Sequence, residues 1–427
     1  MTERTDTVRG RSATGMIVAG ALLGVAAAVA AMEWLLINVM ATEPLWDLAV
    51  YRGAIDLWLG GGELYDFRLD HPAREGGFPF TYPPFAAIVM VPLVWIPTVL
   101  ADNLWTFGSL VLTVIMAAFV VWRAPRTAAT WLGSSPRTTT LVSFTAAAVI
   151  LLLLTFPGVH NLVLGQISFL IAALMLIDVG GGVPARFRGA LVGIAGALKL
   201  TPLMAVPYFA VTRQWRAMLM AVGVFAAATV AALIVYPTGS LEYWTRSLLE
   251  TARVGDPATV QNKSILGLLS RWDIAPDWTT VLWVLLVLGV VGVALWQARR
   301  QYLHGDQVAA ALIVGCAAVA ASPVSWPHHQ VWIILVAVWL LLRRRPLFMV
   351  LGAAIVVINI AGSPLMGQEV VPLAADDPLL LTLGRELPTL SFVIVCLAGL
   401  PLRSDAPTTR GHGTMAPAES TSSATGE

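Results

Sequence analysis

The sequence has few charged residues and almost no cysteine. Asp, Glu, Lys and Arg make up 12% of its 427 residues, against roughly 25% in an ordinary soluble domain. A net charge of +1 excludes the strongly basic surface that favours nucleic acid as a partner. The two cysteines, Cys316 and Cys396, both lie in apolar runs, which argues against a disulfide framework or a cysteine metal site.

Familiar nucleotide-binding motifs are also missing. The chain has no P-loop, no Rossmann glycine fingerprint and no serine nucleophile elbow. Chemistry on ATP or on a nucleotide sugar is therefore disfavoured. An internal repeat is not evident either, and this weighs modestly against a transporter built from repeated units.

Long apolar runs dominate the composition instead. Hydrophobic residues make up 57% of the chain and the mean hydropathy is +0.77, so the sequence predicts an all-α polytopic membrane protein. The predicted apolar segments are 15–40, 85–97, 99–122, 139–156, 163–179, 189–211, 217–236, 279–298, 307–321, 329–342, 347–361 and 388–402.

Arginine positions set the predicted topology. Three arginines in the N-terminal segment 1–14 place that segment in the cytoplasm by the positive-inside rule. Twelve simple crossings would then put Arg123 and Arg186 on the wrong side of the membrane. The conflict disappears if two segments are broken or re-entrant. We assign these to the short, proline-bounded segment 85–97 and to segment 189–211, which a lysine and a proline interrupt.

The corrected topology places a large first loop, 41–84, outside the membrane, and six carboxylates lie between residues 46 and 85. The apolar pattern of residues 46–59 predicts an amphipathic helix that lies on the membrane surface. The glycines at 60–62 end this helix. In a second large external loop, 237–278, the spacing of Leu241, Trp244 and Leu248 on one helical face predicts another interfacial helix. The loops 157–162, 322–328 and 362–387 also fall outside, and the tail 403–427 is predicted to be disordered cytoplasmic chain.

Three polar side chains each allow two interpretations. Asp47 is either a helix-start carboxylate stabilised by backbone amides or a general base that takes a proton from an acceptor hydroxyl. Gln166 either hydrogen-bonds between helices or contacts a sugar hydroxyl. Lys199 either snorkels to an interface or approaches an anionic head group at membrane depth.

Two adjacent histidines lie in the polar, proline-rich turn 322–329. His328 and His329 point to different sides of a helix, so a metal ion shared by both is not expected. We expect one ring to hydrogen-bond a phosphate or sugar oxygen while the other packs.

A set of short motifs follows in one order along the chain: Asp47-x-x-x-Tyr51, Gly62-Glu63-Leu64-Tyr65, Tyr82-Pro83-Pro84-Phe85, Gly165-Gln166, Lys199-Leu200-Thr201-Pro202, Asn262-Lys263-Ser264 and Ser322-Pro323-x-Ser325-Trp326-x-His328-His329. This order resembles the actinobacterial polyprenol-phosphate-mannose-dependent α-(1→2)-mannosyltransferases, which belong to glycosyltransferase family 87 and have the membrane GT-C fold. The resemblance covers roughly residues 15–402. One departure is Lys263, where relatives more often carry glutamine.

The resemblance implies a GT-C transmembrane catalytic domain over residues 15–402. It would have about 10–13 membrane helices, broken or re-entrant segments included, and interfacial helices in the first external loop. The implied reaction moves mannose from polyprenyl-phosphate mannose to a mannosylated lipid, either a phosphatidylinositol mannoside or lipomannan, in an α-(1→2) linkage. It takes place among membrane lipids on the outer face of the plasma membrane and needs no nucleotide-binding domain.

The resemblance also implies roles for residues. In GT-C enzymes the first external loop supplies the catalytic acidic residue, which maps onto Asp47 as the general base of an inverting transfer. The departing phosphate needs charge stabilisation rather than protonation. The candidates for it are Lys199, Arg271, Arg52 and one of His328 and His329, and the further candidates for substrate binding are Gln166, Asn262 and Tyr82.

GT-C enzymes differ in whether they use a divalent cation, and the resemblance leaves that question open. We assign no cofactor and no metal ligand, because the chain offers no obvious carboxylate cluster beyond Asp47 and Asp56.

Two other functions compete with the transferase. A transporter or flippase for a lipid-linked sugar would also place polar residues at membrane depth, but it predicts an inverted repeat and a central site. A non-catalytic subunit of an envelope-assembly complex would need no acid that solvent can reach. The gathering of polar residues on the external side favours the transferase.

Overall fold

The computed structural model describes residues 45–71, 74–123, 137–272, 274–343, 345–366 and 378–402. Most of this chain is helical, which confirms the predicted all-α class. The predicted first span, 15–40, and the predicted tail, 403–427, lie outside the described residues and stay predictions.

Helices or helical pairs account for the predicted apolar segments within the described residues. Their bounds are α2 (Trp46–Leu59), α3 (Pro84–Met90), α4 (Thr98–Trp122), α5 (Arg137–Leu154), α6 (Phe156–Leu164), α7 (Ser168–Val179), α8 (Ala190–Leu198), α9 (Ala205–Val211), α10 (Trp215–Val235), α11 (Pro237–Glu242), α12 (Thr251–Val254), α13 (Ile265–Ser270), α14 (Pro276–Leu303), α15 (Gln307–Ala321), α16 (Val331–Leu341), α17 (Pro346–Met366) and α18 (Pro378–Ala398). Short single turns are η1 (Leu64–Asp66), η2 (Val91–Leu93), η4 (Ala185–Phe187), η5 (Thr201–Met204), η6 (Tyr243–Ser247) and η7 (Pro327–Gln330).

Both predicted broken segments are broken. Helix α8 ends at Leu198, Lys199 has an extended backbone (φ −158°, ψ 132°), and the chain resumes as η5 and α9. Pro202 lies in the first turn of η5, where its missing N–H is no loss. The other segment is the short helix α3 followed by the single turn η2.

Two local predictions are wrong. The predicted external loop 157–162 is instead part of helix α6, because Pro157 occupies the first turn, where proline favours helix formation. The last predicted segment, 388–402, starts too late: α18 begins at Pro378 and carries Pro388 in its interior.

Helices α15 and α16 form the centre of the membrane-embedded bundle. Both are apolar on every face and buried along most of their length, as expected for helices surrounded by protein. Gly315 allows the two helices to approach closely, because a Cβ atom there would lie 2.1 Å from the Trp332 ring. Helix α15 has 15 residues and α16 has 11, so neither is long.

Longer helices surround this centre. Within the described residues, α4, α5, α10 and the Asp277–Leu303 part of α14 are long and apolar enough to cross a membrane. Their outward faces expose large apolar side chains such as Phe107, Ile234 and Leu288, which would be unfavourable in water. The chain is therefore a membrane protein.

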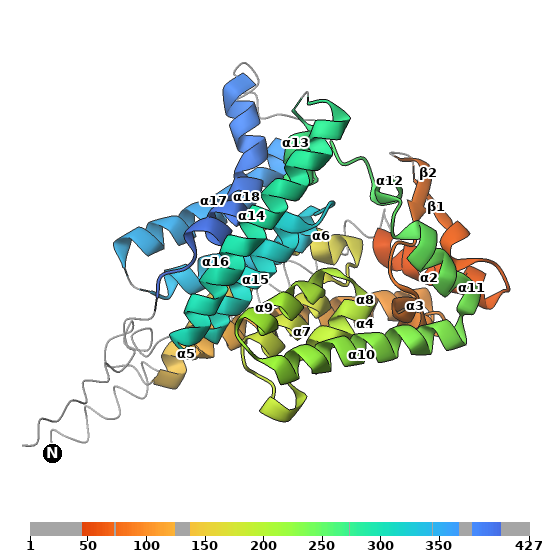
Figure 1. Ribbon diagram of the computed structural model, residues 1–427, viewed down its shortest axis with the longest axis horizontal. Coiled ribbons are helices and arrows are strands. Elements are labelled where there is room, and N and C mark those ends of the chain that lie inside the picture. The colour runs from red at the N-terminus through yellow and green to blue at the C-terminus, as the bar shows by residue number, and fades with distance from the viewer. Residues whose placement is uncertain are drawn as a thin grey trace, which may run out of the picture.

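A second hydrophobic core lies at one end of the bundle, beside α2. The apolar side chains of α2 are buried against protein on more than one face, and the predicted position of this helix on the membrane surface stays a prediction. The hairpin of β1 (Arg68–His71) and β2 (Arg74–Pro79), which the sequence did not suggest, pairs Leu69 with Phe78 over this core. Figure 1 shows α2, α3, the hairpin, α11 and α12 gathered at this end.

The predicted second interfacial helix is present but irregular. Helix α11 continues into the single π-helical turn η6. Leu241 is 58% exposed, whereas Trp244 packs against the second core.

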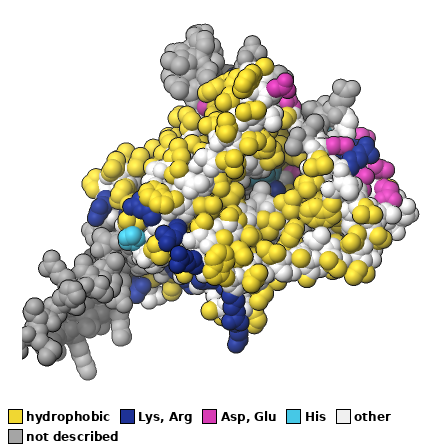
Figure 2. Space-filling model, in the orientation of Figure 1, with side chains coloured by type: hydrophobic (Ala, Val, Ile, Leu, Met, Phe, Trp, Pro, Cys, Tyr) yellow, Lys and Arg dark blue, Asp and Glu magenta, His cyan; other side chains and the backbone are white. Residues whose placement is uncertain are grey.

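Charged side chains separate toward two ends of the molecule. Figure 2 shows a broad hydrophobic surface with most of the visible Lys and Arg at the lower left and the visible Asp and Glu mainly at the right and upper edge. Arg213 lies between α9 and α10, and Arg299 and Arg300 lie near the end of α14, whereas acidic residues occur around the hairpin and α11.

Candidate active site

Asp47 lies in the first turn of α2, at the point where the second core meets the bundle. Its partly buried carboxylate accepts a hydrogen bond from the side chain of Gln166 and lies in the electrostatic field of Lys199. Burial raises the pKa of Asp47 to about 6. The Gln166 hydrogen bond opposes this rise, and so does the charge of Lys199 when that lysine is protonated. A carboxylate with this pKa is ionised at neutral pH and basic enough to take a proton from a hydroxyl group.

Gln166 connects Asp47 to two tyrosines. Tyr82 Oη donates to Gln166 Oε1 at 3.0 Å, and Tyr51 Oη lies 2.9 Å from Tyr82 Oη and 3.3 Å from the same Oε1. Because Oε1 accepts from the tyrosines, the amide Nε2 is the atom that donates to Asp47. Gln166 therefore bonds between elements and also orients the carboxylate.

Gly165 brings α6 close enough to α2 for this contact. It ends α6 in the left-handed conformation (φ 67°, ψ 43°), and a Cβ atom there would lie 2.9 Å from Cβ of Leu48 and 3.0 Å from Cβ of Leu45. Only glycine fits both the conformation and the approach.

Lys199 is directed into the protein and does not snorkel. Its Nζ lies 2.6 Å from Nε2 of His329 and 5.2 Å from the centre of the Tyr82 ring. The chain break between α8 and η5 makes this possible, because the extended backbone at Lys199 separates the residue from both helices. At the broken helix Lys199 therefore contacts the His329 imidazole and lies within electrostatic range of the Asp47 carboxylate.

The two histidines of η7 point in different directions. Their rings stand at 84° to each other, His329 meets Lys199, and Nδ1 of His328 lies 3.2 Å from Nδ1 of His160. Nδ1 of His329 accepts from the backbone N–H of Trp326 at 3.1 Å, which fixes the ring.

His160 is a member of the cluster that the sequence reasoning did not select. Its ring stacks on His328 at 13° and 5.4 Å between centres. The neighbouring Asn161 and Gln330 are fully buried, and within the described residues their side-chain amides have no hydrogen-bond partner. These unpaired amides, together with His160 and His328, form a polar contact between α6 and η7. In the sequence, this contact is indicated only by the adjacent polar residues His160 and Asn161.

Arg271 does not join the cluster. It forms a two-point ion pair with Glu386 of α18, with N–O distances of 2.7 and 2.6 Å, and its Nη1 donates to the carbonyls of Thr259 and Asn262. Arg52 also points elsewhere, because its Nη2 donates to the Ile96 carbonyl at 3.1 Å.

Asn262 braces the loop that carries the histidines. Its Nδ2 donates to the carbonyls of Pro257 and Pro323 at 3.1 Å each, and its Oδ1 accepts from the backbone N–H of Ser325 at 2.9 Å. The neighbouring Lys263 donates its backbone N–H to the Ser325 carbonyl at 2.8 Å. The segment that contains Asn262 and Lys263 therefore fixes the turn that precedes η7.

A cavity of about 30 Å³ lies behind Lys199 and His329, between η5, α7 and α15. Ser168 and Ser325 are among its lining residues, and Ser168 Oγ has no partner in the described structure. This volume is large enough for a water molecule.

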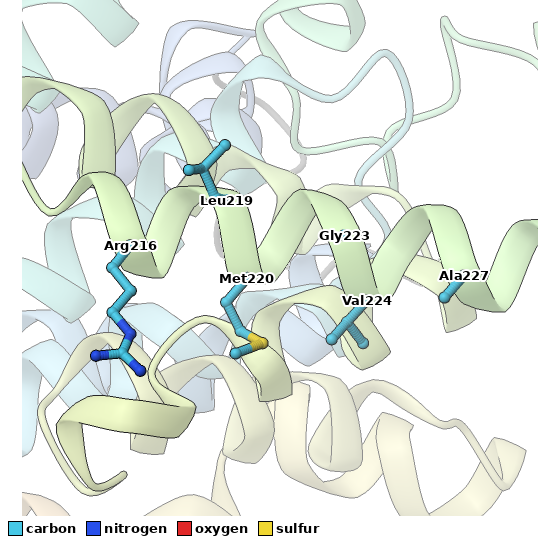
Figure 3. A pocket seen from close by; sticks show the side chains of 6 residues that line it. All are labelled: Arg216, Leu219, Met220, Gly223, Val224 and Ala227. Carbon is cyan, nitrogen blue, oxygen red and sulfur yellow. The ribbon is translucent and has the colours of Figure 1, made fainter.

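A larger hollow of about 560 Å³ lies on the outward face of α10 and is apolar except for one arginine. Figure 3 shows the side chains of Arg216, Leu219, Met220 and Val224 along this helix. None of the candidate site residues lines the hollow, so it is not a part of the Asp47 cluster.

Among the described residues, no group of three His, Cys, Asp or Glu side chains is placed to hold a metal ion. We therefore assign none of these side chains to a divalent cation.

A helical membrane bundle with a carboxylate set against a lysine and a histidine at a broken helix is consistent with a membrane glycosyltransferase of the GT-C class. The chain belongs to glycosyltransferase family 87, whose sequence pattern matches residues 80–323. It is therefore a glycosyltransferase, and the predicted family, fold class and enzyme type are confirmed.

Several mycobacterial enzymes are similar to the chain over most of its length. It is 34% identical over 318 residues, 70% of this chain and 71% of the relative, to the polyprenol-phosphate-mannose-dependent alpha-(1-2)-phosphatidylinositol mannoside mannosyltransferase of Mycolicibacterium smegmatis. The protein of the same name from Mycobacterium tuberculosis is 32% identical over 351 residues, 78% of this chain and 80% of the relative. A phosphatidylinositol pentamannoside mannosyltransferase of M. smegmatis is 31% identical over 312 residues, 72% of each chain. No solved structure matches the chain.

Proposed function

We propose that the chain transfers mannose from polyprenyl-phosphate mannose to a mannosylated lipid and forms an α-(1→2) linkage with inversion. The names of its relatives support this donor, this linkage and a phosphatidylinositol mannoside as the acceptor. Lipomannan is the alternative acceptor in this proposal. A transporter or a non-catalytic subunit is no longer needed to explain the chain.

The observation that carries the proposal is the position of Asp47 opposite Lys199 and His329. Asp47 takes the proton of the acceptor 2-hydroxyl, whose oxygen attacks the anomeric carbon of the donor mannose. The bond between that carbon and the phosphate oxygen breaks in line, and its electron pair leaves with polyprenyl phosphate. Lys199 and the Nε2 side of His329 stabilise the charge that develops on the phosphate.

Other cluster members position these groups. Gln166 holds the Asp47 carboxylate, and Tyr82 holds Gln166 while its ring lies beside Lys199. His328 supports the histidine turn from the side of His160.

Arg271 and Asn262 have a structural role in this proposal rather than contact with the donor phosphate. Glu386 already neutralises Arg271, and four backbone groups use the Asn262 side chain. Arg52 likewise binds backbone near α4.

We propose that the reaction takes place on the external face of the plasma membrane. The support is the separation of charge, because arginines gather at the ends of α9 and α14, as on a cytoplasmic face. The Asp47 cluster borders the second core, and Figure 2 shows the visible Asp and Glu side chains mainly at the right and upper edge, where Figure 1 draws the hairpin at the right-hand end.

The test is the substitution Asp47→Asn, assayed with membranes that contain polyprenyl-phosphate mannose and a panel of mannosylated lipids. We expect at least about a hundredfold loss of mannose transfer, because a positioned base contributes about 10²–10⁴ in rate. The matched control is Asp56→Asn, because Asp56 is an exposed carboxylate on the same helix. Equal activity of the two variants would remove Asp47 from the mechanism, and linkage analysis of the product tests the α-(1→2) assignment.

A further inference from the structure

The contact between Lys199 and His329 restricts where hydrogens can lie. Nδ1 of His329 accepts from the Trp326 N–H, and in a neutral imidazole the other nitrogen then carries the hydrogen. The Nε2–H group of His329 therefore points at Nζ of Lys199, 2.6 Å away.

An ammonium group cannot satisfy this contact. It has three N–H donors and no acceptor, so two donors would face each other. An uncharged amine accepts the Nε2–H hydrogen through its lone pair. The other imidazole tautomer would turn an N–H toward the Trp326 N–H and lose that hydrogen bond, which leaves a buried donor without a partner.

We propose that Lys199 is an uncharged amine in the empty site and takes up one proton from solvent when a phosphate group binds between its Nζ and Nε2 of His329. The proton bonds to Nζ through its lone pair, both nitrogens then donate to one phosphate oxygen, and no bond of the phosphate group forms or breaks. This inference rests on the proposed function, because it identifies where the phosphate of polyprenyl phosphate binds.

The groups around Lys199 decide how readily it is protonated. Burial of Lys199 disfavours its charged form, and the negative charge of Asp47 from α2 favours it. His328 and His329 of η7, His160 of α6 and the Tyr82 ring are the other titratable neighbours, and Tyr51 lies behind Tyr82. The described cavity lining that α7 and α15 contribute adds no titratable side chain.

Protonation on binding would favour the bond-breaking step. The donor is a phosphodiester with one negative charge, whereas the departing polyprenyl phosphate is a monoester that gains a second charge. Lys199 becomes cationic when a phosphate oxygen contacts its Nζ and Nε2 of His329. This cation stabilises the doubly charged leaving phosphate more than the singly charged donor, and such a difference between the two states is what accelerates the reaction.

The experiment titrates the full-length protein in detergent with farnesyl phosphate, a short-chain phosphate monoester. Between pH 8 and pH 9.5, where this probe is already a dianion, we expect the Kd to rise about tenfold per pH unit, because binding takes up one proton. Calorimetry at pH 9 in two buffers of different ionisation enthalpy should report uptake of about one proton per molecule bound.

Substitutions identify the group that takes up the proton. Lys199→Arg is always charged and Lys199→Gln is never charged, so farnesyl phosphate should bind either variant with a Kd that does not change between pH 8 and pH 9.5. Lys263→Arg is the matched control, because Lys263 is the other of the two lysines in the chain and its Nζ donates to the Arg385 carbonyl at 2.6 Å. This control should keep the wild-type pH dependence.

A wild-type Kd independent of pH, or the wild-type slope in Lys199→Arg, would overturn the proton uptake and leave mannose transfer from the lipid donor as a separate question. Failure of the wild-type protein to bind farnesyl phosphate at any pH overturns the phosphate site itself. Absence of mannose transfer from polyprenyl-phosphate mannose, by contrast, contradicts the proposed function.

Discussion

Replacing Gln166 by methionine should shift the acid side of the pH profile of mannose transfer. The methionine side chain has a similar length but cannot donate to Asp47. In the wild-type protein the Gln166 hydrogen bond favours the ionised carboxylate and lowers its pKa, so its loss must raise the pKa above the present value of about 6.

The size of this shift follows from the hydrogen bond. Hydrogen bonds to charged groups contribute roughly 1.5–3 kcal/mol, which corresponds to about one to two pKa units. Asp47 acts as a base only when ionised, so the wild-type rate should fall about tenfold per pH unit below pH 6. In Gln166→Met the same fall should begin at about pH 7 to 8.

The assay is kcat/KM for transfer from polyprenyl-phosphate mannose, measured from pH 5 to pH 9. Gln214→Met is the control, because Gln214 lies next to α10 and hydrogen-bonds Arg188 and Thr212 away from the cluster. An unshifted acid side in a folded Gln166→Met protein would show that the carboxylate which titrates is not oriented by Gln166, and the interpretation of Asp47 as the base would lose its geometric support.

Two further predictions concern packing. Gly165→Ala should lower the Tm and reduce kcat, because an L-residue in the left-handed conformation costs about 1–2 kcal/mol and its Cβ would press on Leu48 and move α2. The control is Gly108→Ala, where a Cβ meets nothing within 4 Å, so its Tm and kcat should equal those of the wild type. Equal results for the two variants would contradict this prediction. Arg271→Met should destabilise the protein by about 3–5 kcal/mol because it leaves Glu386 buried without its partner, and a thermal unfolding curve should show that adding Glu386→Gln restores much of the loss. If Arg271→Met instead kept the wild-type stability and lost only donor binding, Arg271 would again be a candidate for binding the donor phosphate.

Features that depend only on neighbouring residues could be predicted from the sequence. The break at Lys199 follows from a charged residue and a proline close together in an apolar segment, and both features act on the local backbone. Asp47 could be selected because it begins a helix beside the membrane. The divergence of His328 and His329 follows from their adjacent positions.

Contacts between distant segments could not be predicted in this way. Arg271 looks like a free cation in the sequence because its partner Glu386 lies 115 positions away. The second core buries α2 through contacts with the hairpin and α3, so an amphipathic pattern alone could not distinguish protein from lipid as its neighbour. His160 contacts His328, which lies 168 positions further along the chain, so the sequence does not reveal this pairing.

The shortness of α15 has a consequence for water. Its 15 residues extend about 22 Å, whereas the hydrocarbon layer of a bilayer is about 30 Å thick, so α15 alone is too short to cross that layer. The turn that follows it carries His329, so the phosphate of the donor would be held below the level of the lipid head groups. Bulk water reaches such a depth poorly, and hydrolysis of the activated sugar would therefore be slow until an acceptor hydroxyl enters.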